Sequence, residues 1–243
     1  MPKKKIIFFD AVGTLFDVTG GVGFQYSRLA LQYGVRVDPN ILDQRFREVF
    51  KRCPDLAFPG VTPSLLDQVE KAWWRCLVRE VFEGIPFPHF DDFFEAVYSF
   101  FEKGKGDESP WMLFPETRDV LGHLTQLGHP MGIISNFDSR MGPVLVSLGI
   151  ASFFQTITFS SQEGVAKPSV VIFHRALEKA GCNACDTLFI GDNPSIDGEG
   201  ANAAGIPFLL IDREAKADIP SSRELTIPAH KTISSLWEVN QYI

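Results

Sequence analysis

The chain has 243 residues, 45% of them hydrophobic, and carries a formal net charge of −7. This length and apolar content allow a large buried core and exclude an intrinsically disordered chain. The acidic balance opposes binding to nucleic acid or anionic lipid, and no apolar stretch is long enough to span a bilayer. We therefore expect neither nucleic acid nor a membrane as a partner. The chain enters its first strand without a signal peptide, so we expect a cytoplasmic location.

The first predicted element is a short strand at residues 6–9, which read Ile-Ile-Phe-Phe. A continuous apolar run of this kind is typical of a strand buried on both faces, as in a parallel sheet. Asp10 follows directly, and ligands of open α/β sheets bind beyond the carboxyl ends of the strands. Gly13 lets the chain turn close beside this carboxylate. Asp10 is therefore a candidate site residue.

A helical region follows. Asp-Pro at 38–39 and Thr-Pro at 62–63 each open a helix as N-cap and first residue, and a third helix is expected to hold the apolar residues between 93 and 101. No strand pattern interrupts this region, and the polar segment 104–110 is interpreted as a return linker. We therefore predict an all-helical insert at residues 17–109, which lies on the ligand side of the sheet and can act as a cap.

The predicted insert is rich in aromatic residues, including the Trp73–Trp74 pair. Aromatic residues at helical spacing belong to the core more often than to a substrate pocket. We interpret these side chains as core.

From residue 110 onward the chain alternates helix and strand. Helices are expected at 115–127, 141–148, 170–180, 196–204 and 234–240, and strands at 131–134, 156–159, 188–190 and 207–211. Repeated βα units with short apolar strands favour a doubly wound parallel sheet. The expected fold class is therefore α/β, with a Rossmann-like core at residues 1–16 and 110–243 and the helical cap inserted between them.

Four segments carry a resemblance to the haloacid dehalogenase-like hydrolase superfamily. They are residues 10–15 (Asp-Ala-Val-Gly-Thr-Leu), Ser135-Asn136, Lys167-Pro168, and residues 191–197 (Gly-Asp-Asn-Pro-Ser-Ile-Asp). They occur in the family's order, each after a predicted strand or at a loop entering a helix. The resemblance covers essentially the whole chain. It implies the fold and the reaction centre, but not the substrate.

The resemblance implies that Asp10 is a nucleophile, since a carboxylate can attack phosphorus or a polarised carbon and form a covalent intermediate. Ser135 is expected to donate a hydrogen bond to a phosphoryl oxygen, with the amide of Asn136 beside it. Lys167 would offset negative charge on the nucleophile and the phosphoryl group. Thr14 is expected to support the loop through its hydroxyl and its backbone.

The resemblance also implies a metal site. Carboxylates such as Asp192 and Asp197 suit a hard cation, most simply Mg²⁺. The superfamily's metal typically takes the nucleophile carboxylate, a backbone carbonyl two residues on, and the first acidic residue of the fourth motif, which here are Asp10, Val12 and Asp192. Asp197 is a further ligand, directly or through water, or serves only as the N-cap of the next helix.

Val12 departs from the family's phosphatases, which carry an Asp there that protonates the leaving oxygen and then activates water. Valine can do neither. General acid–base catalysis contributes roughly 10²–10⁴-fold, so alkyl phosphates are expected to be poor substrates unless water or a cap residue supplies the proton. The backbone carbonyl of Val12 is unaffected, so the metal site is retained.

Three functions stay open at this stage. The favoured one is Mg²⁺-dependent hydrolysis of a phosphorylated small molecule through an aspartyl-phosphate at Asp10. The second is a metal-free 2-haloacid dehalogenase, because the first motif resembles that branch and a halide leaves without a proton. That branch uses an arginine and aromatic residues to hold its substrate, but the arginines of the predicted cap match no motif: Arg28, Arg45, Arg47 and Arg75. The third is a non-catalytic binding or regulatory protein. The sequence fixes neither the substrate nor the oligomeric state.

Overall fold

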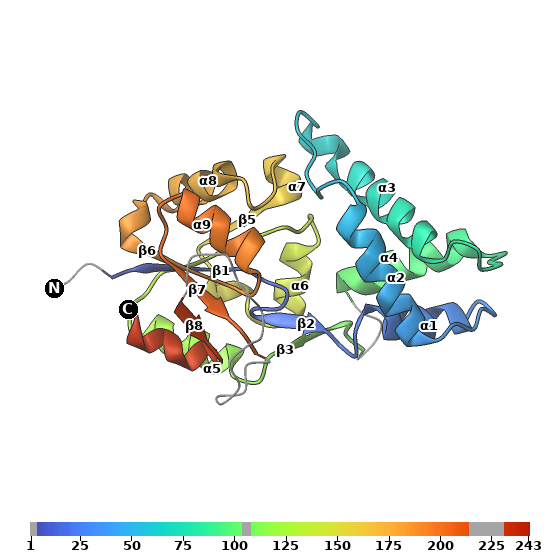
Figure 1. Cartoon of the computed structure of the whole chain (residues 1–243), viewed down its shortest axis with the longest axis horizontal. Coiled ribbons are helices and arrows are strands. Elements are labelled where there is room, and N and C mark those ends of the chain that lie inside the picture. Colours follow the sequence, from blue (N-terminus) through green and yellow to red (C-terminus); the bar gives the residue numbers. More distant parts are fainter. Residues whose placement is uncertain (1–3, 104–107, 214–230) are drawn as a thin grey trace.

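The computed structural model describes residues 4–103, 108–213 and 231–243. Its centre is a six-stranded sheet formed by β1 (Ile6–Phe9), β4 (Met131–Ser135), β5 (Thr156–Phe159), β6 (Thr187–Gly191), β7 (Phe208–Ile211) and β8 (Lys231–Ile233). The order across the sheet is β5-β4-β1-β6-β7-β8, and every neighbouring pair is parallel (Figure 1). The chain thus winds outward from β1 in both directions, which confirms the predicted doubly wound fold.

Helices cover both faces of the sheet (Figure 1). One face carries α5 (Thr117–Gln126) and α6 (Met141–Ser147), and the other carries α8 (Val170–Ala180) and α9 (Glu199–Ala203). The residues of β1 alternate between the two layers: Ile7 and Phe9 belong to one apolar cluster, and Phe8 belongs to the other. All three side chains are fully buried. Because both faces are covered, the strand reads as a continuous apolar run.

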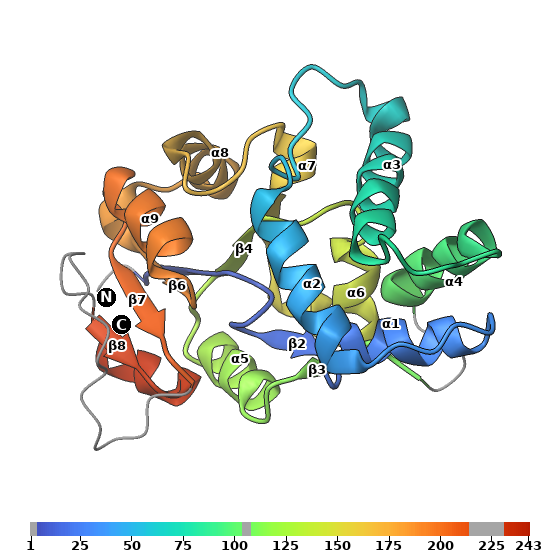
Figure 2. The ribbon, with the colours of Figure 1, turned by 45° about the vertical axis from the view of Figure 1, so that its right-hand side comes forward.

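Four further helices lie together to one side of the sheet, as Figures 1 and 2 show. They are α1 (Val22–Leu31), α2 (Pro39–Arg52), α3 (Pro63–Val81) and α4 (Phe90–Lys103). Asp38 caps α2 as predicted, since its side chain accepts a hydrogen bond from the Asn40 N–H at 2.8 Å. One apolar cluster continues from the α5–α6 face of the sheet into these helices. Within the described ranges, no helix combines the length and apolar character needed to cross a membrane.

A short antiparallel ribbon pairs the two segments by which the chain passes from the sheet to these helices and back. It pairs β2 (Phe16–Val18) with β3 (Trp111–Leu113), and the rings of Phe16 and Trp111 pack edge to face at 5.5 Å. The sequence analysis does not predict this ribbon, because each strand is only three residues long and its partner lies far away in the chain. The expected return linker lies partly outside the described residues, at 104–107.

The predicted helix at 196–204 is wrong in detail. The segment begins as a wide π-helical turn, η3 (Pro194–Gly198), and continues as the short α9. π-Turns are often found at functional sites, where they re-aim a side chain. Here the turn contains Asp197, whose carboxylate points back toward the strand ends.

Two elements at the end of the chain also differ from the prediction. β8 is absent from the prediction, because its three residues offer too short a pattern. The expected helix at 234–240 is a 3₁₀-helix, η4 (Leu236–Gln241), opened by a capping box between Ser235 and Glu238.

Candidate active site

A cavity of about 390 Å³ lies between the carboxyl ends of the strands and helices α1–α4. Seven of the residues predicted from the sequence line it: Asp10, Val12, Ser135, Asn136, Lys167, Asp192 and Asp197. They come from segments far apart in the sequence, and they meet because β1 lies between β4 and β6 in the sheet. We call these seven residues the floor of the pocket. Thr14 is not among the lining residues.

Lys167 is the centre of the floor. Its ammonium donates to Asp10 Oδ1 at 2.6 Å, to Asp197 Oδ1 at 2.6 Å and to the Ile134 carbonyl at 3.0 Å. The residue is only 3% exposed. Burial disfavours the charged ammonium, but the two carboxylates outweigh this effect and raise the pKa of Lys167. Lys167 is therefore held in its charged form against the predicted nucleophile.

Asn136 holds the backbone of Lys167. Its Nδ2 donates to the Lys167 carbonyl at 3.0 Å, and its Oδ1 accepts from the Lys167 N–H at 2.8 Å. The sequence analysis placed this amide beside a phosphoryl oxygen, whereas in this geometry it fixes the loop that carries Lys167. Ser135, at the end of β4, is 3% exposed and lines the pocket.

Three carboxylates gather on the floor. Oxygen atoms of Asp10, Asp192 and Asp197 lie within 4.8 Å of one another. Two glycines make room for them: a Cβ atom on Gly13 would lie 2.4 Å from Asp192 Oδ2, and one on Gly191 would lie 2.4 Å from Asp197 Oδ2. Gly13 also has φ +83°, a conformation that other residues rarely adopt. Both motif glycines are therefore required by close approach to a carboxylate.

Asp197 is a buried structural partner rather than a helix cap. It is 1% exposed, its Oδ1 binds Lys167, and its Oδ2 accepts from the Asn193 N–H at 3.0 Å. The N-cap of the turn is Asn193, whose side chain accepts from the backbone of Ser195 and Ile196. The N-cap alternative for Asp197 is therefore wrong. Asp192 is the most exposed of the three carboxylates.

The cluster carries excess negative charge, because one ammonium faces three carboxylates. Desolvation is the largest effect that raises the pKa of Asp192, and the negative charges of Asp10 and Asp197 add to it. Together they raise this pKa to about 7. Desolvation and the charge of Asp10 raise the pKa of Asp197 to about 6, against the opposing effect of Lys167. A divalent cation would relieve this repulsion, and carboxylate and carbonyl oxygens are the donors that Mg²⁺ prefers. The residues present therefore fit a magnesium ion.

Arg213 supports the loop that follows Asp10. Its guanidinium donates to the Thr14 carbonyl at 2.6 Å and to Glu116 at 2.7 Å, and it lies 3.6 Å from the centre of the Phe114 ring. Thr14 thus supports the loop through its backbone as predicted, but its buried hydroxyl has no hydrogen-bond partner among the described residues. The sequence analysis missed Arg213, which belongs to no motif.

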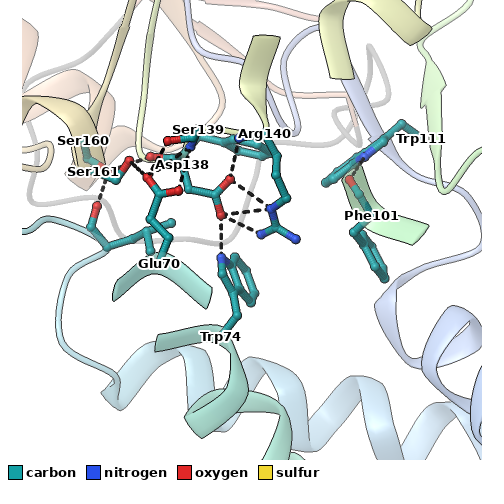
Figure 3. A network of polar contacts seen from close by, with 11 residues as sticks. Glu70, Trp74, Phe101, Trp111, Asp138, Ser139, Arg140, Ser160 and Ser161 are labelled. Carbon is teal, nitrogen blue, oxygen red and sulfur yellow. Dashed lines mark hydrogen bonds and ion pairs between the residues drawn. The ribbon is translucent and has the colours of Figure 1, made fainter. Parts of the chain in front are cut away.

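A buried polar network joins helix α3 to the loop after β4 and to the short helix α7 (Ser160–Glu163), as Figure 3 shows. The fully buried Glu70 carboxylate accepts from the Ser139 N–H at 3.1 Å, from the Ser139 hydroxyl at 2.9 Å and from the Ser161 hydroxyl at 2.5 Å. Trp74 donates its indole N–H to Asp138 Oδ2 at 2.5 Å. We call these contacts the docking network. Burial raises the pKa of Glu70. The network fixes the helical insert over the floor.

Aromatic rings form the opposite side of the pocket. The lining rings are those of Tyr26, Phe46, Phe50, Trp74, Phe94, Tyr98, Phe101, Trp111 and Phe137. The interpretation of the cap aromatics as core alone is therefore incomplete. Phe94 and Phe101 belong to the buried apolar cluster and also line the pocket.

The arginine that lines the pocket lies outside the predicted cap. Arg140, in the loop after β4, is 8% exposed, and its guanidinium donates to Asp138 at 2.6 Å. The four cap arginines considered above do not line the pocket. Arg28 instead donates to Glu108, and Arg75 to Asp91.

Comparisons with known proteins agree with this fold. A sequence model of the haloacid dehalogenase-like hydrolase family matches residues 4–205. The chain is 31% identical to haloacid dehalogenase-like hydrolase domain-containing protein 3 of Danio rerio, over 96% of this chain and 93% of that protein. It is 32% identical to a glyceraldehyde 3-phosphate phosphatase of Methanothermobacter thermautotrophicus, over 52% of this chain and 58% of that protein. A solved dehalogenase structure superposes with a TM-score of 0.71 at 16% identity, covering 100% of this chain and 98% of the other, and shows the shared fold.

Proposed function

Because the chain belongs to the haloacid dehalogenase-like hydrolase family, we propose that it is a Mg²⁺-dependent hydrolase of a phosphorylated small molecule. The observation that carries the proposal is the cluster of three carboxylates gathered around a buried lysine. The similarity to a glyceraldehyde 3-phosphate phosphatase supports phosphate-ester chemistry. Residues 1–16 and 110–243 would act as the catalytic core, and residues 17–109 as a cap that covers the substrate.

In this proposal Asp10 is the nucleophile. Its carboxylate attacks phosphorus, the bond from phosphorus to the ester oxygen breaks, and an aspartyl-phosphate forms that water then cleaves. Lys167 holds one oxygen of Asp10 at 2.6 Å, which fixes the direction of attack. Its positive charge also offsets the charge of the phosphoryl group. Ser135 lines the same pocket and would donate a hydrogen bond to a phosphoryl oxygen.

Asp10, the carbonyl of Val12 and Asp192 would hold the Mg²⁺ ion. Asp197 is already occupied by Lys167 and the Asn193 backbone, so it supports the site from outside. When bound, the ion supplies positive charge that lets a phosphate group approach a negatively charged nucleophile. Without such charge, three neighbouring carboxylates would repel an anionic substrate.

Protonation of the leaving oxygen is the incomplete part of this site. Val12 lines the pocket and has no proton to give. Outside the cluster, the other carboxylate among the described lining residues is Asp17, on β2. The proton would therefore come from water or from Asp17.

The test is a phosphate-release screen with a panel of phosphate esters, with and without Mg²⁺. We expect turnover that requires Mg²⁺ and falls to background in Asp10→Asn, which keeps the side-chain shape but removes the nucleophilic charge. Beryllium fluoride should bind the wild type and not the variant.

The same screen separates the two other functions. Halide release from a 2-haloacid without Mg²⁺, and no phosphate release, would support the dehalogenase alternative. Mg²⁺ binding with no turnover above the Asp10→Asn control would support a non-catalytic protein. Turnover retained in a contaminant-free Asp10→Asn sample would remove Asp10 from the mechanism.

A further inference from the structure

We propose that the substrate is a phosphate monoester of a flat, largely apolar alcohol, such as an arylalkyl alcohol, rather than of a sugar or polyol. This inference rests on the proposed function, since it assigns the substrate class of the same pocket. It is carried by the side of the pocket opposite the floor, where aromatic faces are presented and both indole N–H groups are already bonded within the protein.

Helices α1–α4 and the loop between α2 and α3 contribute apolar groups to the pocket almost without exception. Their lining residues are Val22, Tyr26, Phe46, Phe50, Leu56, Trp74, Val78, Phe94, Val97, Tyr98 and Phe101. No charged side chain is among these eleven. A ligand held by this wall therefore meets ring faces and aliphatic groups.

The two indole N–H groups beside the pocket are turned to other partners (Figure 3). Trp74 donates to Asp138 Oδ2 at 2.5 Å, and Trp111 donates to the Phe101 carbonyl at 3.0 Å. Both tryptophans line the pocket. Since each N–H is already bonded, these rings present faces and edges rather than donors to a ligand.

Two nitrogens of Arg140 are also bonded within the protein. Its Nε and Nη2 donate to Asp138 at 3.0 and 2.6 Å, and its guanidinium carbon lies 4.9 Å from the ring centre of Trp74 and 4.4 Å from that of Tyr98. Its charge is thus balanced by a carboxylate and covered by two aromatic rings. The third guanidinium nitrogen of Arg140 and the hydroxyls of Tyr26 and Tyr98 are the polar groups that this side of the pocket can offer to a substrate.

This distribution discriminates between substrate classes. A polyhydroxylated body would leave hydrogen bonds in water and find few partners on this wall. A flat apolar body would be removed from water against aromatic faces, which is favourable. The cavity volume of about 390 Å³ lies within the range of small-molecule pockets.

The test compares 2-phenylethyl phosphate with sn-glycerol 3-phosphate in the presence of Mg²⁺. Both are alkyl esters, so the missing acid at Val12 affects them alike. We expect kcat/KM to be about 100-fold higher for the phenylethyl ester, which is the ratio given by burying one aromatic side-chain equivalent. Equal rates, or a preference for the glycerol ester, would overturn the inference and leave the phosphatase function standing.

A binding measurement separates the two proposals. Calorimetry with 3-phenylpropylphosphonate and 3,4-dihydroxybutylphosphonate, which cannot be hydrolysed, reports recognition without turnover. Preferential binding of the phenyl compound, with no phosphate ester hydrolysed, would show that the pocket recognises a flat apolar group but would contradict the proposed function, and with it the assignment of a substrate. Equal binding of the two phosphonates, or binding of neither, would overturn the inference.

A matched pair of variants places the effect in the wall. Val97 lines the pocket, whereas Val49 is equally buried in α2 and does not line it. Val97→Thr puts a hydroxyl into the apolar wall, so we expect it to reduce the preference for the phenyl compound by about tenfold, while Val49→Thr preserves it. An unchanged preference in folded Val97→Thr would contradict the assignment of this wall.

Discussion

The floor and the wall of the pocket are built in opposite ways. On the floor, charged groups are tied to one another, with Lys167 bonded to two carboxylates and Asn136 bonded to the backbone of Lys167. On the wall, aromatic rings pack edge to face, as Phe101 does against Trp111 at 5.7 Å. In the proposed function the floor carries out the reaction but hardly tells one phosphate ester from another. The wall has no reactive group, yet it is the part that can select.

The two regions also differ in how they are held. Apart from Lys167, the floor lies beyond the ends of β1, β4 and β6, which are central strands buried on both faces. The wall is carried by separate helices, and its position depends on contacts such as those of Glu70 with Ser139 and Ser161. Changes to the floor should therefore alter chemistry, and changes to the docking network should alter substrate binding.

The largest effect is expected from restoring an acid to the floor. Val12→Asp places a proton donor at the spacing used by the family's phosphatases, so it should raise kcat/KM for an alkyl phosphate by roughly 10–10³-fold. An aryl phosphate should change much less, because its leaving group needs no proton. The measurement is kcat/KM for both esters in both proteins, with Mg²⁺ present.

If the wild type already treats alkyl and aryl esters alike, another group supplies the proton and this account of Val12 is wrong. Asp17→Asn would then identify the source, since losing a donor at Asp17 should slow the alkyl ester selectively.

The second effect concerns the metal. Asp192→Asn removes a charged oxygen ligand, so it should weaken Mg²⁺ binding by at least about 100-fold, given that changes outside the ligand shell already cost 10–100-fold. Asp17→Asn is the matched control, because Asp17 lines the same pocket but is not part of the carboxylate cluster. Isothermal calorimetry on both variants is the measurement, and equal affinities for Mg²⁺ would refute the ligand assignment.

Most of the floor could be predicted from the sequence, because its residues follow recognisable strands or, like Lys167, lie in a loop that enters a helix. The parallel order of the sheet then brings the strand ends together, as it does for Asp10 and Asp192 after β1 and β6. The sequence did not reveal how the side chains divide their hydrogen bonds. That Asp197 binds Lys167 while Asn193 caps the turn depends on a π-helical turn, which has no pattern of its own in the sequence.

The wall and its supports could not be predicted in this way. Periodicity correctly placed Phe94 and Phe101 on apolar helix faces, but the same spacing serves a core and a pocket equally well. Glu70 and Arg213 act through partners distant in the sequence. Arg140 bonds the nearby Asp138, but the rings that cover it, Trp74 and Tyr98, are distant, so no local motif distinguishes these three residues from surface charges. The ribbon of β2 and β3 was missed for the same reason.

A smaller effect should follow from pH, which acts on the carboxylates of the floor. Burial raises the pKa of Asp192 to about 7, so at the proposed metal site Mg²⁺ would have to displace its proton. The apparent Mg²⁺ affinity should therefore rise about tenfold between pH 6 and pH 8. Without metal the sign for stability is reversed: the folded protein holds this proton more tightly than the unfolded chain, so stability should fall as pH rises from about 4 to 7.

Thermal melts at pH 5.5 and 8, with and without Mg²⁺, measure both trends. Mg²⁺ should raise the melting temperature more at pH 8, and an equal shift at both pH values would contradict the raised pKa of Asp192.

The smallest effect on the reaction is expected from the docking network. Glu70→Gln replaces one accepting oxygen by an amide N–H that faces donors, since both carboxylate oxygens accept from the Ser139 N–H. We expect a loss of about 1–3 kcal/mol in the free energy of unfolding. Because the network holds the wall and touches no floor residue, KM should rise several-fold while kcat changes little.

Glu80→Gln is the control. Glu80 lies on α3, as Glu70 does, and forms a partly exposed ion pair with Arg52, so the change should cost no more than about 1 kcal/mol in the free energy of unfolding. Urea unfolding and steady-state kinetics on the two variants give the comparison. A fall in kcat with unchanged KM would mean that floor and wall are coupled through the loop after β4, and the division between chemistry and selection would not hold.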